Sequence, residues 1–466
     1  MSTTTDLAYL SLREASDLLD ARKVSPVELT EACIARAEAL EPRLNAYITR
    51  TFDTARQEAR AADAEIAAGR RKGPLHGVPF AIKDLYETAG VTTTAGSALR
   101  EHYVPAEDAE TVRRLKDAGA VMLGKLSLHE WAMGGTNVQS YYPTPRNAWD
   151  TARITGGSSG GSGTALAAGY CYGSLGSDTR GSIRIPASLC GVSGIKATYG
   201  RVSLRGVVPL SWSLDHAGPM ARTAFDCALI LNTIAGYDPR DPTSSDLPVE
   251  DYTNGIEASL AGVRIGVPRN WFFDEGFTEP EIARIVQASR DVFASLGAVV
   301  SYVDFPGPLE WEASSAFGAE AASYHKDNVA AHPDKYSDPT RTRIEQSQSI
   351  TGMAYERARW QQLELQQGVR ELFRSVDLVL TPTSPIPPMV IEDAPVWQPA
   401  GNLLARNTSP FNVAHVPTVS VTCGFDSLGL PVGLSLAGRW WEEALVLRAA
   451  HAYQSVTDWH TRRPPL

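Results

Sequence analysis

Residues 155–163 read Thr-Gly-Gly-Ser-Ser-Gly-Gly-Ser-Gly, and residues 178–184 read Asp-Thr-Arg-Gly-Ser-Ile-Arg. These two serine-bearing glycine loops flank a short apolar segment, and Lys83 closes another apolar run, residues 78–82, further upstream. Glycine lets backbone N–H groups turn toward a reacting atom, and a serine hydroxyl can attack or relay a proton. A lysine acts as a base where burial holds it neutral. The pattern indicates a serine hydrolase whose catalytic set contains no histidine.

The first loop has three plainer interpretations. A flexible linker is disfavoured because the loop runs directly into the helix-like stretch 164–168. A phosphate-binding loop would continue into Gly-Lys-Ser or Gly-Lys-Thr, which this loop does not. Residues 156–160 formally match the GxSxG nucleophile elbow, but that elbow follows a buried strand, and residues 149–155 are mostly polar. The GxSxG match alone is therefore weak.

The composition is that of an ordinary soluble globular protein, with 43% hydrophobic and 21% charged residues. The net charge of −10 argues against a nucleic-acid partner, because such binding is driven by clustered Lys and Arg. The sequence has no apolar run of membrane-spanning length and no secretion signal, so we expect a cytoplasmic protein without a membrane span. The five cysteines form no CxxC pair, which fits reduced thiols rather than a structural zinc site.

Strands and helices alternate along the chain, which predicts an α/β fold. Capping boxes at Ser11 and Ser25 begin a helical layer over residues 1–65. The stretch 245–345 is richer in Asp, Pro and Ser, and we expect it to be a variable surface insertion in a single domain spanning 1–466. Strands are expected near 78–82, 120–123, 377–381, 418–423 and 431–436, and helices near 279–296 and 442–455.

Several motifs together resemble the amidase signature family. Residues 77–84 look like the strand that carries its catalytic lysine, and residues 176–187 look like its nucleophile segment. Similar stretches also lie at 146–150, 156–162, 194–203, 213–219, 235–241 and 429–434. The resemblance implies one large α/β/α domain in which helices cover both faces of a mixed central sheet. The core motifs would occupy 70–245, and residues 375–466 would complete the core.

The resemblance also implies a role for each residue of the two loops. Ser182 would be the nucleophile that forms an acyl-enzyme, Ser158 the bridging serine after a cis peptide bond, and Lys83 the base. The backbone N–H groups of one loop would form the oxyanion hole: Thr179, Arg180, Gly181 and Ser182. Three further residues would support the site: Ser159, Asp178 and Arg184. No cofactor and no metal is implied.

Two charged residues beside this machinery raise specific expectations. Burial must lower the pKa of Lys83 from its ordinary value for this base to work near neutrality. Asp84 would oppose that shift, so we expect its carboxylate to point elsewhere and to bind backbone. Arg180 departs from the family, which often has glycine at that position. Its side chain either faces solvent or borders the substrate cleft and selects charged groups.

An acyl pocket is harder to place from sequence. Five residues lie between the lysine strand and the first glycine loop and are candidates for its lining: Trp131, Met133, Gly134, Tyr141 and Tyr142. Aromatic and Met side chains in such a segment are equally often plain core. Both interpretations stay open.

The favoured function is hydrolysis of the C–N bond of a small-molecule amide by a stand-alone amidase of the aryl acylamidase kind. A carbamate or an ester is also a candidate substrate, because the same oxyanion chemistry serves all three. The first alternative is the glutaminase subunit of a tRNA-dependent amidotransferase, disfavoured because the C-terminal third, with residues 409–412, looks more like stand-alone amidases. A non-catalytic binding protein on the same scaffold is the second alternative. A homodimer is kept open.

Overall fold

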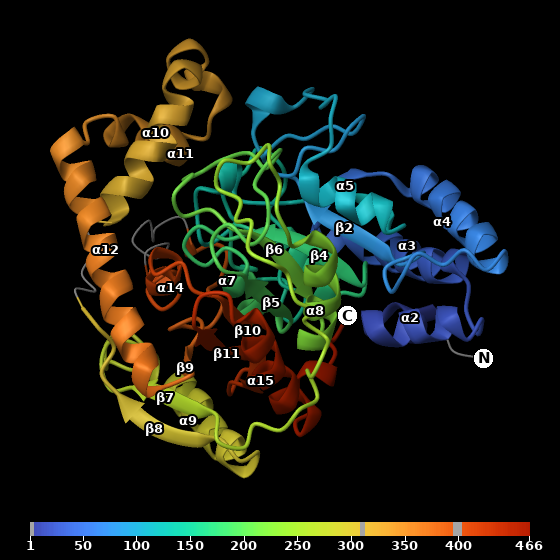
Figure 1. Cartoon of the computed structure of the whole chain (residues 1–466). Coiled ribbons are helices and arrows are strands. Elements are labelled where there is room, and N and C mark those ends of the chain that lie inside the picture. Colours follow the sequence, from blue (N-terminus) through green and yellow to red (C-terminus); the bar gives the residue numbers. More distant parts are fainter. Residues whose placement is uncertain (1–3, 308–312, 395–402) are drawn as a thin grey trace.

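The computed structural model describes residues 4–307, 313–394 and 403–466. The centre of the described part is one mixed sheet of eleven strands, in the order β1-β3-β2-β4-β6-β5-β10-β11-β9-β7-β8 (Figure 1). The expected α/β class is confirmed. The strands are β1 (Tyr47–Arg50), β2 (Pro79–Lys83), β3 (Val121–Leu126), β4 (Gly173–Ser177), β5 (Ser193–Lys196), β6 (Ala217–Ala221), β7 (Arg264–Pro268), β8 (Val299–Val303), β9 (Leu378–Pro382), β10 (Thr418–Phe425) and β11 (Pro431–Gly438).

Strand direction in this sheet positions the two residues that end β2 and β4. β2 runs parallel to both β3 and β4. Because the carboxyl ends of parallel strands meet at one edge of a sheet, Lys83 at the end of β2 and Ser177 at the end of β4 come together there. From β4 through β6, β5, β10 and β11 to β9 the neighbours are antiparallel, and β9, β7 and β8 are again parallel.

Helices cover both faces of the sheet. A Cβ added to Gly433 of β11 would meet Ser188 of α7, whereas one added to Gly438 of the same strand would meet Val446 of α15. The two glycines are an odd number of residues apart, so they face opposite sides, and so do α7 and α15. The core helices are α5 (Glu110–Asp117), α6 (Gly160–Ala167), α7 (Arg184–Cys190), α8 (Ala224–Ile234), α9 (Pro280–Ser295), α14 (Ser409–Val413) and α15 (Glu443–Ser455).

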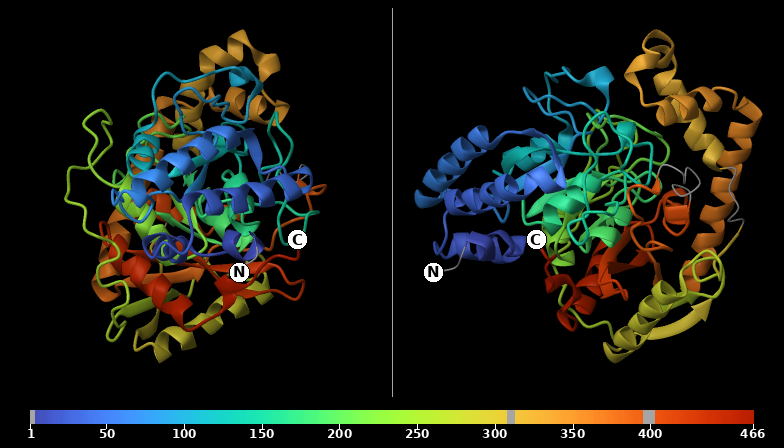
Figure 2. Two further views of the ribbon diagram at one scale, coloured as in Figure 1. Left: turned by 90° about the vertical axis from the view of Figure 1, so that its right-hand side faces the viewer. Right: turned by 180° about the vertical axis from the view of Figure 1, so that it is seen from behind.

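The N-terminal helical layer forms as the capping signals predict. Ser25 accepts a hydrogen bond from the Glu28 N–H, while the Glu28 carboxylate accepts from the Ser25 N–H, and Ser11 with Glu14 does the same. This layer lies on the opposite side of the molecule from the helices of residues 313–375 (Figures 1 and 2). Its helices are α1 (Thr4–Ala8), α2 (Leu12–Asp20), α3 (Pro26–Leu44) and α4 (Phe52–Ala67).

The stretch 245–345 differs from a simple surface insertion. Its strands β7 and β8 pair in the central sheet beside β9. Its second half forms α10 (Ala313–Ala331) and α11 (Asp338–Ser347), and α10 packs against both α11 and the long α12 (Gly352–Ser375). Part of this stretch therefore belongs to the core sheet, and part stands beside it as a helical arm (Figure 1). Across the described ranges, no helix combines the length and apolarity needed to cross a membrane.

Candidate active site

Lys83 is completely buried and is surrounded by serine hydroxyls. Its Nζ atom lies 2.7 Å from Ser158 Oγ, 3.0 Å from Ser159 Oγ and 2.8 Å from Ser177 Oγ. Ser177 reaches it because β4 ends beside β2, and the other two hydroxyls come from the loop before α6. Ser177 lies in the segment that resembles the nucleophile region, but no role for it was predicted from the sequence.

Burial lowers the pKa of Lys83 to about 7, against the opposing charges of Asp215 and Asp178. Asp84, its neighbour in sequence, points elsewhere as expected. Its Oδ2 accepts a 2.8 Å hydrogen bond from the Thr94 N–H, and its Oδ1 forms a 3.0 Å ion pair with Lys125. The Asp84 carboxylate is thus paired with Lys125. It does not stabilise the protonated form of Lys83, which can therefore be neutral near pH 7.

The loop around Ser158 is fixed by close backbone packing. The Gly157–Ser158 peptide bond is cis, as the resemblance implies. A Cβ at Gly157 would lie 2.7 Å from the Gly134 carbonyl oxygen, so the close approach of these two segments requires glycine. The two glycine loops are tied together by a 3.2 Å hydrogen bond from the Ser159 N–H to the Ser182 carbonyl.

Ser182 lies at the turn just before α7 and borders a cavity of about 270 Å³. Gly181 before it has a φ of +129° and would place a Cβ against the Thr408 hydroxyl, so this turn requires glycine. Ser158 and Lys83 are fully buried, whereas Ser182 retains 9% of its surface. Of the three predicted catalytic residues, Ser182 is the one that opens onto the cavity.

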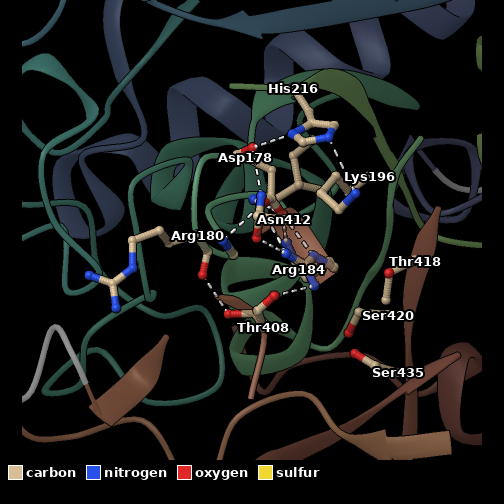
Figure 3. A network of polar contacts seen from close by, with 12 residues as sticks. Asp178, Arg180, Arg184, Lys196, His216, Thr408, Asn412, Thr418, Ser420 and Ser435 are labelled. Atoms are coloured by element: carbon tan, nitrogen blue, oxygen red, sulfur yellow. Dashed lines mark hydrogen bonds and ion pairs between the residues drawn. The ribbon is translucent and has the colours of Figure 1, made fainter. Parts of the chain in front are cut away.

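The loop carrying Ser182 is organised around Asp178 (Figure 3). Its carboxylate accepts from Arg184 Nε at 2.9 Å and from Asn412 Nδ2 at 2.8 Å. Burial alone would raise the pKa of Asp178, but Arg184 and Asn412 hold that pKa well below its usual range. Asp178 and Arg184 are both completely buried, so the pair is a fixed ion pair beneath the turn. Asn412 belongs to α14, a partner that the sequence analysis did not assign.

One of the predicted oxyanion donors is already used. The Gly181 N–H donates to Asp178 Oδ1 at 2.7 Å, which corrects the expectation that it faces a substrate. The N–H groups of Thr179 and Ser182 have no acceptor among residues 4–307, 313–394 and 403–466. Thr179 and Ser182 both border the cavity. These two N–H groups remain candidates for binding a developing oxyanion, and the role of the Arg180 N–H stays a prediction.

The cavity wall includes two of the five candidate pocket residues, Met133 and Gly134. Trp131 instead packs in the interior, with its ring 4.6 Å from that of His325 and 5.9 Å from that of Tyr336. Tyr141 and Tyr142 stack edge to face with each other, and neither borders the cavity. Trp131 is therefore plain core, as the second interpretation has it, whereas the exposed Tyr141 and the partly buried Tyr142 fit neither interpretation.

Arg180 borders the cavity rather than bulk solvent. Its Nε donates to Ser409 Oγ at 3.0 Å, and its guanidinium extends away from the Asp178–Arg184 pair (Figure 3). The helical arm also contributes to the cavity wall, with Phe317 of α10 and Arg343 of α11 among its residues there. The sequence carries no motif around either position, and neither was foreseen.

Comparison with known proteins shows which proteins this chain is similar to. The family model for Amidase matches residues 28–447. A glutamyl-tRNA(Gln) amidotransferase subunit of Moorella thermoacetica is 43% identical over 99% of both chains. The corresponding protein of Chloroflexus aggregans is 42% identical over 99% of both chains. Both relatives carry the name of the alternative, an amidotransferase subunit, and not that of the stand-alone amidase that the C-terminal third suggested.

Similar solved structures include a peptide amidase and a protein complex related to a catabolic enzyme. The peptide amidase of Stenotrophomonas maltophilia has a TM-score of 0.87 and 32% identity, with 98% of each chain covered. A structure described as an unexpected vestigial protein complex that reveals the evolutionary origins of an s-triazine catabolic enzyme has a TM-score of 0.88 and 34% identity. It covers 96% of this chain and 98% of that one.

Proposed function

Because this chain belongs to the amidase family, we propose that it cleaves the C–N bond of an amide through an acyl-enzyme on Ser182. The observation that carries the proposal is the buried contact of Lys83 Nζ with Ser158 Oγ, 2.7 Å long, at a lysine whose pKa burial lowers to about 7. Such a lysine is a base at physiological pH. A base beside a hydroxyl, next to a second serine on a cavity wall, is the arrangement that serine nucleophiles require.

The proposed reaction is a proton relay along the two serines. Neutral Lys83 takes the Ser158 proton, and Ser158 takes the proton of Ser182 as Ser182 Oγ attacks the amide carbonyl. The N–H groups of Thr179 and Ser182 stabilise the oxyanion that forms. The proton then returns along the same path to the leaving nitrogen, and the C–N bond breaks. Water repeats the sequence on the acyl-enzyme and releases the acid.

The proposed function has two forms, which differ in the amide that is cleaved and in whether the chain acts within a larger assembly. The full-length match to amidotransferase subunits supports a role as the amide-hydrolysing component of a larger assembly, with glutamine as the ammonia donor. With a net charge of −10, this chain would meet a tRNA through a partner rather than by its own surface. The likeness to a peptide amidase supports the second form, a stand-alone hydrolase of small amides, carbamates or esters.

A hydrolysis panel tests the reaction and separates the two forms. Purified chain would be given glutamine, aliphatic amides, anilides, carbamates and esters, and release of ammonia, amine or alcohol would be measured. We expect turnover that Ser182→Ala and Lys83→Ala abolish while both variants keep the wild-type unfolding midpoint. Release of ammonia from glutamine only when other proteins co-purify would favour the assembly. Turnover that survives Ser182→Ala would reject the proposed nucleophile.

A further inference from the structure

Asp215 lies beside the loop that carries Ser182, although the proposed reaction gives it no role. It belongs to residues 213–219, one of the stretches that resemble the amidase signature family. Its side chain is 6% exposed and does not itself border the cavity. A buried carboxylate is costly unless hydrogen bonds satisfy it, so its contacts show which neighbours it holds in place.

Strand pairing places Asp215 opposite Thr179. The antiparallel ladder of β4 and β6 extends one residue beyond both strands. There the Asp178 N–H donates to the His216 carbonyl at 2.8 Å, and the His216 N–H donates to the Asp178 carbonyl at 3.1 Å. The next pair in this register is Thr179 and Asp215. Side chains of opposite residues in an antiparallel pair lie on one face, within reach of each other.

The Asp215 carboxylate joins two segments of the cavity wall. Its Oδ1 accepts a 2.5 Å hydrogen bond from the Thr179 hydroxyl. Its Oδ2 accepts from the Leu210 N–H at 2.8 Å and from the Ser211 N–H at 3.0 Å. Thr179 and Leu210 both border the cavity. Because hydrogen bonds to an ionised carboxylate are stronger than neutral ones, Asp215 keeps these two segments in a fixed relation.

Resting on the proposed acyl-enzyme reaction at Ser182, we infer that Asp215 is a positioning residue, which holds Thr179 so that its N–H faces the oxyanion. A threonine side chain is stiff at χ1, so a fixed hydroxyl also restrains the backbone of its own residue. Donors that are oriented in advance need no reorganisation at the moment of reaction. Without Asp215, the Thr179 N–H would be free to turn away and would stabilise the oxyanion less.

Removing either side of the contact tests the inference through kcat. Thr179→Val takes away the hydroxyl and keeps the β-branched shape, and Asp215→Ala takes away the acceptor. An oxyanion donor acts on the transition state, so each variant should lower kcat about 10- to 100-fold while KM changes less than about threefold. Acetanilide, propionamide and glutamine are the substrates, and the one that the wild type cleaves fastest is followed. A wild-type kcat in both variants would overturn the inference.

The double variant Thr179→Val/Asp215→Ala shows whether the two residues act through one contact. Its kcat should lie within about threefold of the lower single variant, because the second substitution removes the partner of a hydrogen bond that is already lost. Losses that multiply would mean that the two residues act separately, and they would reject the inference.

Asp215→Asn separates position from charge. Its amide oxygen can accept from the Leu210 and Ser211 N–H groups while its Nδ2 donates to the Thr179 oxygen, so every contact has a counterpart. Burial raises the pKa of Asp215 to about 6 and lowers that of Lys83 to about 7. At about pH 8.5, where Asp215 is ionised and Lys83 neutral, Asp215→Asn should keep kcat within about threefold of the wild type. A loss as large as that in Thr179→Val would reject the inference, and this comparison stands even if Asp215→Ala does not fold.

Asp241 offers a matched control. It is also 6% exposed, and it accepts 2.7 Å hydrogen bonds from the Thr243 hydroxyl and from the Leu204 N–H. None of these three residues borders the cavity. Asp241→Ala should therefore leave kcat within about threefold of the wild type, although it removes the same kind of buried contact. An equal loss of kcat in Asp241→Ala and Asp215→Ala would mean a general loosening of the fold and would reject the inference.

A measurement without turnover separates this inference from the proposed reaction. In protein that carries isotope-labelled threonine, NMR identifies the Thr179 N–H resonance as the one missing from Thr179→Val. Asp215→Ala should shift or broaden this resonance and Asp241→Ala should not, even if no amide is cleaved. An unchanged resonance in Asp215→Ala would overturn the inference. Turnover that depends on Ser182 but is unaffected by Asp215→Ala leaves the proposed function standing and refutes the inference.

Discussion

Lys83 Nζ and Ser158 Oγ lie 2.7 Å apart in the interior although 75 residues separate them in the chain. The contact exists because β2 delivers the lysine to the edge of the sheet at which the loop before α6 also ends. Three hydroxyls surround the amine, and the nearest carboxylate in sequence is paired with Lys125. Within the described ranges, the site therefore keeps this lysine hydrogen-bonded but without an ion-pair partner of its own.

The first prediction concerns pH. Because burial lowers the pKa of Lys83 to about 7, the lysine is protonated and cannot act as a base at lower pH. The kcat/KM for a neutral amide should fall about tenfold per pH unit below that value and level off above it. Steady-state rates between pH 5 and 9 measure this profile. A rate that stays constant down to pH 5, or that rises only near pH 10, would contradict it.

Asp215 supplies the control for that profile. Burial raises its pKa to about 6, while hydrogen bonds from Thr179 and from the N–H groups of Leu210 and Ser211 oppose the shift. Asp215 is thus a second group whose charge changes on the acid side. If the acid-side fall in rate belongs to Lys83, an Asp215→Asn variant keeps this limb but moves it to lower pH, because the charge of Asp215 raises the pKa of Lys83. Loss of the limb in this variant would assign the titration to Asp215 instead.

The second prediction separates the hydroxyls around Lys83. Ser158→Ala interrupts the proposed relay and should lower kcat/KM about 10²- to 10⁴-fold, the usual range for a lost proton-transfer group. Ser177→Ala removes a hydroxyl at a similar distance, 2.8 Å, that lies outside the relay, and should cost less than about tenfold. Steady-state rates of both purified variants measure the difference. Equal losses would mean that Ser158 only positions the lysine.

The third prediction concerns the ion pair under the nucleophile. Arg184→Met leaves the fully buried Asp178 without its charge partner, and the free energy of unfolding should fall by about 3–5 kcal/mol. Arg240→Met, which removes an exposed ion pair with Glu107, should change it by less than about 1 kcal/mol. Denaturant unfolding followed by circular dichroism measures both. A similar small effect in the two variants would show that the Asp178 loop does not depend on the pair.

The fourth prediction tests the packing that fixes α7. A Cβ at Gly433 would lie 2.9 Å from the Cα of Ser188, a backbone atom that cannot rotate away. Gly433→Ala should therefore lower the free energy of unfolding by about 1–3 kcal/mol through overpacking. It should also reduce kcat, because Ser182 stands just before the start of α7.

Gly352 offers the matched control for this substitution. It is the first residue of α12, and a Cβ there meets no described atom within 4 Å. Gly352→Ala should leave kcat unchanged and the stability equal or slightly higher, because alanine favours the helix. Thermal unfolding of the two variants beside the wild type is the measurement. Equal Tm values for Gly433→Ala and wild type would show that the sheet yields to make room.

The residues that carry the proposed chemistry were accessible from sequence because local patterns mark them. Ser158 and Ser182 lie in glycine loops, and Lys83 ends an apolar run; the dense resemblance supplied their order of action. The capping boxes and most of the strands expected near 78–82, 120–123, 377–381, 418–423 and 431–436 also agree with the structure. These features depend on neighbours in the chain.

Features that depend on packing were missed. The ring of Trp131 packs in the interior against His325 and Tyr336, which lie about 200 residues further along the chain. Contacts at that separation decide whether Trp131 lines a cavity. The Gly181 N–H was assigned to the oxyanion although Asp178 already accepts it. Arg343 lies in an ordinary polar helix, and it differs from Arg341 of the same helix in bordering the cavity, which only the folded structure shows.

The cavity is built from two parts of the chain that can change independently. Ser182 and its loop are held by the central sheet and by α7 and α14, whereas Phe317 and Arg343 come from the helical arm. Substitutions confined to residues 313–347 alter the shape and charge that a substrate meets without touching the buried lysine or its serines. Such a chain can acquire a new substrate by local mutation while its reaction stays the same. Directed evolution restricted to α10 and α11 should therefore change the substrate specificity most directly.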